Sequence, residues 1–137
     1  MDNTQLFRLI GTISRQATSE VNRSASVYGL DNNLFLYLIR IVEQDGISQV
    51  ALANQIKVDK TTLSRALTKL TTAQLIVKRT NPKNKKFKQL YATAKGQTYY
   101  NKVYQMEQDY IEAVLKPLQP NEKAMLGQLL TKISPSE

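Results

Sequence analysis

The sequence contains no cysteine and no histidine, and these two absences exclude much of protein chemistry. Without cysteine the chain can form no disulfide and no thiol redox switch, and without either residue the usual zinc sites and every imidazole- or thiolate-based mechanism are excluded. We therefore expect no metal and no cofactor. Only carboxylates, Ser, Lys and Tyr remain as reactive groups, and they form no recognisable catalytic motif, so the sequence argues against an enzyme.

Long hydrophobic runs are also missing. The longest purely apolar run spans residues 34–39, which is too short to cross a membrane. The first residues, Met1-Asp2-Asn3, do not form the basic segment of a secretion signal. With 137 residues, 42% of them hydrophobic and 22% charged, the composition is typical of one globular unit. We expect a single soluble unit over residues 1–137, cytoplasmic and without a membrane partner.

Negative charge is scarce in one stretch of the chain. Residues 57–88 contain ten Lys and Arg but a single acid, Asp59, and so carry a net charge of +9. The whole chain carries +8, so the excess positive charge is concentrated in about a quarter of the sequence. Such a concentration predicts a polyanionic partner.

The basic stretch begins in a pair of short predicted helices. Ser48 is a suitable N-cap for the first, which can continue only to about Lys57, and Asp59 caps the second. Two short helices joined by such a turn form a helix-turn-helix, whose second helix enters a major groove of DNA. At about 100° per residue, Leu63, Ala66, Leu67 and Leu70 point inward, and the outward face consists of Thr61, Ser64, Arg65, Thr68 and Lys69. An ordinary solvated face mixes both charge signs, so this face favours DNA contact.

A two-stranded wing is predicted after the second helix. Residues 75–77 and 90–92 have strand character, and residues 78–86 form a polar loop between them. The tip of the wing contains Lys83, Lys85, Lys86 and Lys88. Like charges crowded together repel unless phosphates neutralise them, and a narrow minor groove is the usual position for such a tip.

The remaining segments are predicted to be helical. One helix spans residues 4–27, a second follows the N-cap Asp31 and ends at Gly46, a third spans residues 95–115, and Glu122 opens the last. The apolar stripe of the first helix can pack on the chain's own core or face another subunit. A chain this short cannot cover all the apolar stripes by itself, so we expect burial against a second copy.

The order of these elements resembles the MarR family of winged helix-turn-helix regulators over almost the whole chain. The matching motifs are Leu52-Ala53, Val58-Asp59-Lys60-Thr61-Thr62-Leu63-Ser64-Arg65, Gln74-Leu75-Ile76, and Thr93 with Gly96. The wing departs from the family pattern, because Asn84-Lys85-Lys86 replaces the common Asp-x-Arg. Lysine lacks the planar fork of arginine, so wing contacts should supply affinity more than sequence choice.

The resemblance implies a mainly α fold with a small two- to three-stranded wing. It implies a winged helix-turn-helix part over about residues 30–94, and dimerisation helices in residues 1–29 and 95–137. A homodimer of this kind positions its two recognition helices so that they bind half-sites about one helical turn apart. The expected function is that of a sequence-specific, ligand-responsive repressor that binds double-stranded DNA. Its effector would be a small aromatic or acyl molecule bound beside the dimerisation helices, where Tyr28, Phe35, Tyr37 and Tyr104 either line the site or are plain core.

Each predicted contact residue has an expected role. We expect base edges or adjacent phosphates to be contacted by Thr61, Thr62, Ser64 and Arg65, with Arg65 reading guanine. Lys60, Lys69 and Ser48 should bind phosphates, and Lys85, Lys86 and Lys88 the minor groove and its backbone. The alternative is an RNA-binding or non-specific nucleic-acid-binding winged-helix module. RNA-binding modules usually display exposed aromatic side chains, and only Phe87 and Tyr91 are near the basic stretch.

Overall fold

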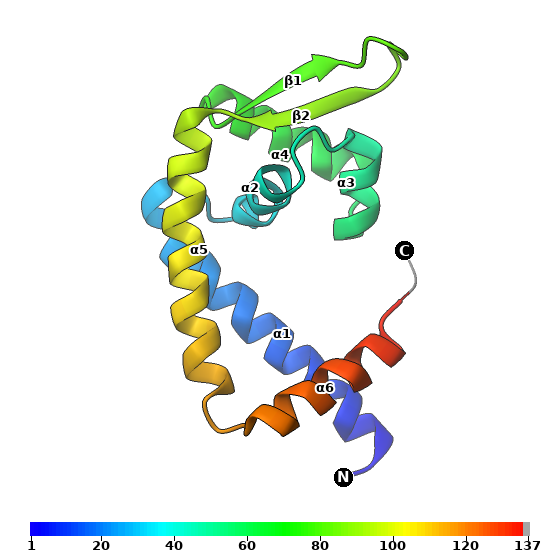
Figure 1. The fold of residues 1–137 in the computed structure, drawn as a ribbon, viewed down its shortest axis with the longest axis vertical. Coiled ribbons are helices and arrows are strands. Elements are labelled where there is room, and N and C mark those ends of the chain that lie inside the picture. The colour runs from blue at the N-terminus through cyan, green and yellow to red at the C-terminus, as the bar shows by residue number, and fades with distance from the viewer. Residues whose placement is uncertain (136–137) are drawn as a thin grey trace.

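A computed structural model describes residues 1–135. These residues form six α helices, one short 3-10 helix (η1) and a two-stranded sheet, as Figure 1 shows. The elements are α1 (Asn3–Ala25), η1 (Ser26–Tyr28), α2 (Leu34–Glu43), α3 (Gln49–Ile56), α4 (Lys60–Thr72), β1 (Ile76–Thr80), β2 (Lys88–Ala92), α5 (Ala94–Leu115) and α6 (Pro120–Ile133). The mainly α fold with a small wing is therefore confirmed.

The hydrophobic core lies between α2, the helix-turn-helix and the base of the wing. Its fully buried side chains come from every one of these elements and include Leu38, Ile41, Leu52, Leu67 and Leu90. Helix α2 is apolar on nearly all sides and is the central element of this core, in agreement with its sequence. No buried side-chain nitrogen or oxygen in residues 1–135 lacks a hydrogen-bond partner, so the burial of this core leaves no side-chain polar group unpaired.

The start of α2 differs from the sequence-based expectation. Asp31 is not the N-cap; the cap is Asn33, whose backbone is left-handed at φ 66° and whose side chain makes no capping bond. The Asn33 amide instead donates to Asn22 Oδ1 at 2.9 Å, and Asn22 Nδ2 donates to Asn33 Oδ1 at 2.8 Å. A pairing between residues eleven positions apart therefore sets where α2 begins, and local capping preference does not.

The wing is a hairpin of β1 and β2, antiparallel, with Ile76 opposite Ala92 and Thr80 opposite Lys88. Both strands extend further toward the tip than residues 75–77 and 90–92, so the predicted bounds were too short. An isolated bridge between Ser48 and Gln89 joins the start of α3 to β2. The wing is thereby attached to the helix-turn-helix and is not a free arm.

Helix α5 connects the winged part to the opposite end of the molecule (Figure 1). Thr93 caps it by accepting the Gly96 amide at 3.0 Å and also donates to the Gln74 carbonyl at 2.7 Å. A Cβ on Gly96 would collide with the Leu75 carbonyl oxygen, so only glycine allows the helix to approach this closely. The first turn of α5 is therefore fixed to the segment that joins α4 to β1.

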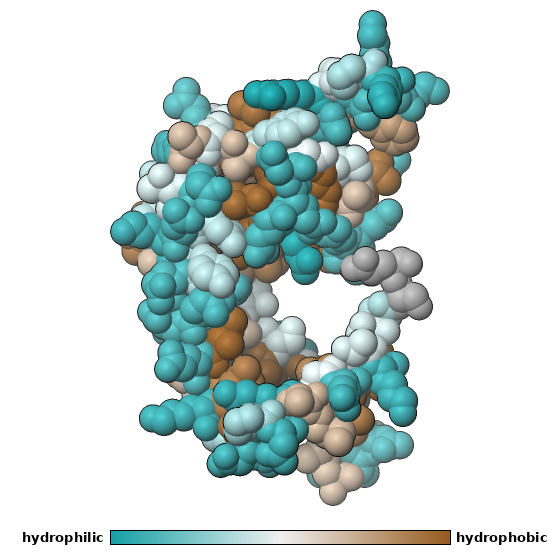
Figure 2. All heavy atoms as spheres, viewed as in Figure 1, coloured by the Kyte–Doolittle hydropathy of each residue, from teal (hydrophilic) through white to brown (hydrophobic). Residues whose placement is uncertain are grey.

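The terminal helices leave much apolar surface uncovered. Helix α6 begins at Pro120 with Gln119 as its cap, so Glu122 does not open the helix but lies at the third helical position of a capping box. None of the residues of α6 is buried, and the first half of α1 is also exposed, with Phe7 at 78%. Figure 2 shows hydrophobic side chains at the surface of the lower half of the molecule as well as on the winged part above it. No helix within residues 1–135 is both long and apolar enough to span a membrane.

Candidate DNA-binding surface

Helix α4 has one buried face and one exposed face. Leu63, Ala66, Leu67 and Leu70 are buried in the core. Lys60, Thr61, Thr62, Ser64, Arg65 and Lys69 are all exposed. The predicted inward arc is thus confirmed by burial, and the predicted contact residues of α4 lie where a partner can reach them. We refer to these six residues together with Lys85, Lys86 and Lys88 as the basic face.

Two N-caps fix the helix-turn-helix. The Ala51 amide donates to Ser48 Oγ at 3.1 Å, and the Thr62 amide donates to Asp59 Oδ1 at 2.7 Å. Between them, Lys57 takes the left-handed conformation at φ 62° and ends α3. Ser48 remains half-buried, and its hydroxyl hydrogen can still be donated to a phosphate. Both predicted caps are therefore present and set the angle at which α4 faces outward.

Asp59 is an acid within a strongly basic region. The Thr62 amide and the Thr62 hydroxyl stabilise its charged form, with smaller contributions from the Thr61 amide and Arg65, and hold the pKa of its carboxyl below the ordinary value. Asp59 therefore stays ionised, and its negative charge interacts favourably with the positive end of the α4 dipole. It does not pair with a lysine or arginine among residues 1–135, where the ion pair present is Arg23 with Glu20 at 3.2 Å.

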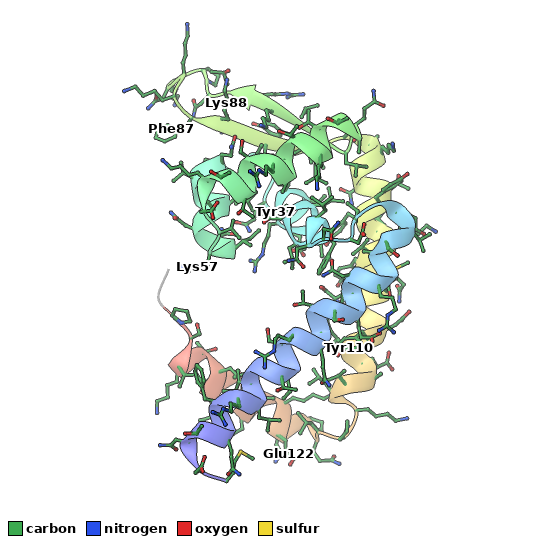
Figure 3. All side chains as sticks on the ribbon, turned by 180° about the vertical axis from the view of Figure 1, so that it is seen from behind. Tyr37, Lys57, Phe87, Lys88, Tyr110 and Glu122 are labelled. Carbon is green, nitrogen blue, oxygen red and sulfur yellow. The ribbon has the colours of Figure 1, made fainter. Side chains whose placement is uncertain are left out.

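A hollow of about 330 Å³ separates the wing from α4 and α3. Lys60 and Ser64 of α4 line it, together with Lys86 and Lys88 of the wing, so the structure brings these four predicted residues together. Its remaining lining is Gln49, Val50, Ala53, Leu63 and Phe87. Figure 3 shows Phe87 and Lys88 on the wing. The three lysines that line the hollow make it suitable for binding the phosphates of a nucleic acid.

A second, smaller hollow of about 170 Å³ lies on the other side of α4. Arg65 and Lys69 line it with Thr62, Tyr37 of α2 and Asn32. Burial, together with the nearby Asp59 charge, raises the pKa of the Tyr37 hydroxyl, so this group stays neutral and can donate to a phosphate. Sequence reasoning did not assign Asn32 and Tyr37 to this hollow, or Gln49 and Phe87 to the first one, because each lies outside the basic stretch or carries no charge. No local sequence pattern places them beside α4.

The loop at the wing tip is folded by its own asparagines. The Lys83 amide donates to Asn81 Oδ1 at 2.8 Å, and the Lys86 amide donates to Asn84 Oδ1 at 3.1 Å. Asn84 thus steadies the tip through the backbone, without the charge that the usual aspartate would supply. Lys85 and Lys86 remain exposed, whereas Lys88 Nζ donates to Thr80 Oγ1 at 3.1 Å. Arg79, the wing's arginine, stacks on the Tyr91 ring at 4.9 Å.

A cavity of about 420 Å³ lies apart from the basic face, between α1, α2 and α5. Of the four aromatic residues suggested for an effector site, only Phe35 lines it. Tyr28 packs edge-on against Tyr99 at 5.3 Å, Tyr37 is buried beside α4, and Tyr104 is 42% exposed on α5. The aromatic residue that joins Phe35 here is Tyr110, which sequence reasoning did not single out. Within residues 1–135 there is no cluster of acids that could hold a metal ion.

Together, the fold and the basic face define a winged helix-turn-helix protein. A model of the MarR family matches residues 30–88. The HTH-type transcriptional regulator YybA of Bacillus subtilis (strain 168) is 36% identical over 128 residues, which is 93% of this chain and 85% of YybA. The chain belongs to the MarR family of DNA-binding transcriptional regulators, which are not enzymes.

Two related structures include DNA. A MarR family regulator from Listeria monocytogenes in complex with a 26mer DNA is 37% identical, with a TM-score of 0.89 over 93% of this chain and 85% of that one. A mutant MarR from E. coli in complex with operator DNA is 26% identical, with a TM-score of 0.84 over 96% of this chain and 94% of that one.

Proposed function

We propose that the protein is a homodimeric repressor that binds double-stranded DNA at a specific pseudo-palindromic site. The observation that carries this proposal is the basic face, on which α4 and the wing tip present exposed donors and cations around a common hollow. Relatives of the same fold have been crystallised with DNA, which supports a duplex as the polyanion over RNA. A dimer bound over a promoter would exclude polymerase by occupying the duplex.

The proposed contacts divide by element. Thr61, Thr62, Ser64 and Arg65 of α4 contact base edges or the adjacent phosphates, and Arg65 can fork onto guanine O6 and N7. Lys60, Lys69 and Ser48 hold phosphates that flank the major groove. Lys85, Lys86 and Lys88 follow the minor groove and its backbone. Because the wing presents lysines there, most sequence choice should come from α4.

The dimer is proposed from the uncovered apolar stripes. Leu6 and Ile13 of α1, Val114 of α5, and Leu129 and Ile133 of α6 are each at least 44% exposed in the single chain. Large contiguous apolar surface is rare on a monomer and indicates an interface. We infer that residues 1–29 and 95–137 form the dimerisation part and that residues 30–94 form the DNA-binding part.

A small-molecule effector is part of the proposal. The cavity lies between α2, which belongs to the winged part, and α1 and α5, which belong to the proposed dimerisation part. A ligand held there would favour one spacing of the two recognition helices and thereby change DNA affinity.

The test of the DNA-binding proposal is selection of bound fragments from a random duplex pool, followed by affinity measurements at stated salt concentrations. We expect one pseudo-palindromic site, bound by a dimer at least about a thousandfold more tightly than random duplex. Single-stranded RNA of equal length is the control competitor. Recovery of no common sequence, or tighter binding to the RNA, would contradict the proposal.

A further inference from the structure

The cavity between α1, α2 and α5 is mostly apolar, with Thr18, Glu107 and the hydroxyl of Tyr110 as its polar groups. Its walls include Val21 of α1, Phe35 of α2 and Val114 of α5, and the one charged side chain that lines it is Glu107 of α5. Tyr110, one helical turn beyond Glu107, supplies a second aromatic ring (Figure 3). A half-buried carboxylate that lines a mostly apolar cavity together with two aromatic rings is unusual for a surface that serves only packing.

Glu107 has no cationic partner of its own. The ion pair among residues 1–135 is Arg23 with Glu20, so Glu107 forms none within 4.0 Å. Burial raises the pKa of Glu107, the nearby Glu43 raises it further, and Arg40 only partly offsets them. Glu43 is itself an acceptor for Tyr100, whose hydroxyl donates to it at 3.2 Å. In a chain of net charge +8, this corner is locally negative.

We propose that this cavity binds a small organic cation with an apolar body, and that the positive centre lies against the Glu107 carboxylate and the rings of Phe35 and Tyr110. This assignment rests on the ligand response proposed above and names the chemical class of the ligand. A cation replaces the water that Glu107 loses on burial, and aromatic rings attract a desolvated cation through their quadrupole. The apolar body fills the remaining walls.

The same geometry disfavours an anionic ligand. A carboxylate or phenolate in this cavity would lie beside the half-buried Glu107, and the two like charges would repel. A neutral aromatic molecule could enter but would leave the Glu107 carboxylate without a partner. The charge of the ligand is therefore the feature that the cavity selects.

Binding at this position connects the two parts of the molecule. Phe35 belongs to α2, in the core of the winged part, whereas Glu107 and Tyr110 belong to α5, which extends into the dimerisation part. A cation that contacts both helices would fix α2 against α5. The ligand would shift DNA affinity only as far as it binds one of these arrangements better than the other.

The experiment uses three probes of similar size on the full-length protein. The cation is benzyltrimethylammonium, the neutral probe is its carbon isostere neopentylbenzene, and the anion is phenylacetate. Dissociation constants are measured by ligand-observed NMR, and DNA affinity is measured with and without each probe. The test variant is Glu107→Gln, which keeps the shape of the side chain. The matched control is Glu112→Gln, an exposed residue of the same helix that does not line the cavity.

We expect the cation to bind about tenfold more tightly than the neutral isostere, and the anion to bind most weakly. Glu107→Gln should reduce the preference for the cation to the small part that the two rings supply and leave the neutral probe unchanged, whereas Glu112→Gln should change neither. Equal binding of cation and neutral probe, or a preference that Glu107→Gln leaves undiminished, overturns the cation assignment but leaves the ligand response standing. If none of the three probes binds, as when side chains of a second copy fill the cavity, both the assignment and a ligand response at this site are overturned.

Discussion

A single copy of the chain buries most apolar residues of the winged part, whereas it leaves many apolar residues of the terminal helices exposed. Fifteen of the eighteen buried apolar residues lie between residues 30 and 90. Of the sixteen large apolar residues that are exposed, fourteen lie outside that range, and the two within it, Val50 and Phe87, line the hollow between α4 and the wing. The winged part therefore buries its core alone, whereas the terminal helices have apolar surface that only another molecule can cover.

This difference assigns two kinds of partner to two regions. The exposed surface of the winged part is basic, with a net charge of +9 over residues 57–88, and suits a polyanion. The exposed surface of α1 and α6 is apolar and suits a surface of its own kind. Because α5 connects the two regions, the position of the second copy in the proposed dimer would set the separation of the two α4 helices.

Removal of α6 should have the largest effect on folding and on dimer formation. Deletion of residues 121–137 removes Met125, Leu126, Leu129, Leu130 and Ile133, each worth about 1.5–3 kcal/mol if buried in a dimer. We expect an aggregated or poorly folded monomer, measured by light scattering and circular dichroism. Deletion of residues 134–137 alone leaves α6 intact and serves as the control that should remain dimeric. A well-folded, monodisperse monomer from the longer deletion would show that the terminal helices need no partner.

Two leucine substitutions should separate the regions. Leu67 is 0% exposed and Leu129 is 51% exposed in the single chain. Leu67→Ala should lower the free energy of unfolding by about 2–5 kcal/mol through the cavity it leaves, and should leave the dimer dissociation constant unchanged. Leu129→Ala should weaken the dimer by at least about tenfold, because an apolar contact worth roughly 1–2 kcal/mol is lost in each of the two subunits. Chemical denaturation and analytical ultracentrifugation measure the two quantities. The comparison fails if Leu129→Ala leaves the dimer dissociation constant unchanged.

Within the winged part, a substitution in α4 and one at the wing tip should differ in their effects on affinity for the selected site and for random duplex. Arg65→Ala should cost about 1–3 kcal/mol on the selected site and little on random duplex, because a forked contact to guanine is lost. Lys86→Ala should weaken binding to both DNAs about equally and lower the slope of log affinity against log salt by about 0.9 per contact. Both variants, both DNAs and a salt series are needed. If Lys86→Ala affects only the selected site while Arg65→Ala affects both, the wing reads the sequence and α4 supplies affinity.

The elements that the sequence predicted well are those determined locally. The cap at Asp59 and the apolar spacing of α4 involve residues within four positions of each other, and the structure confirms both. The start of α2 was wrong because Asn22, eleven residues away, pairs with Asn33 and draws the chain into a left-handed turn. Strand length was underestimated because residues 78–80 and 88–89 are polar and largely exposed, so no hydrophobic alternation marks them.

The candidate sites follow the same division. Charge and helical periodicity together predicted the residues of the basic face, since Lys60, Arg65 and Lys86 lie in one continuous stretch of sequence. The hollow lined by Asn32 and Tyr37, and the cavity lined by Glu107, each join segments that are far apart in the chain. Periodicity indicates which face of a helix is apolar but not which helix covers it, so these sites required the tertiary structure.

The smallest expected effect compares the two caps of the helix-turn-helix. The α3 cap, Ser48, is neutral at every ordinary pH, whereas the α4 cap, Asp59, is a carboxylate whose pKa is lowered chiefly by the Thr62 amide. A folded-state pKa below the unfolded value means that the contribution of this cap to stability is fully present above the unfolded pKa, which is about 3.9. It is lost as the pH falls through the lowered pKa of the folded state.

Asp59→Ser should therefore keep a cap but remove its titration. We expect the melting temperature of the variant to fall less between pH 6 and pH 2 than that of the native chain, measured by circular dichroism at constant ionic strength. Ser48→Asp is the converse variant: it places a carboxylate at the start of α3 and should steepen the same fall. Because Asp59 is fully exposed, solvent screens its charge, so the difference should be small and should arise from the hydrogen bond to Thr62. Parallel pH profiles for the native chain and both variants would mean that the cap at Asp59 contributes through its backbone conformation alone.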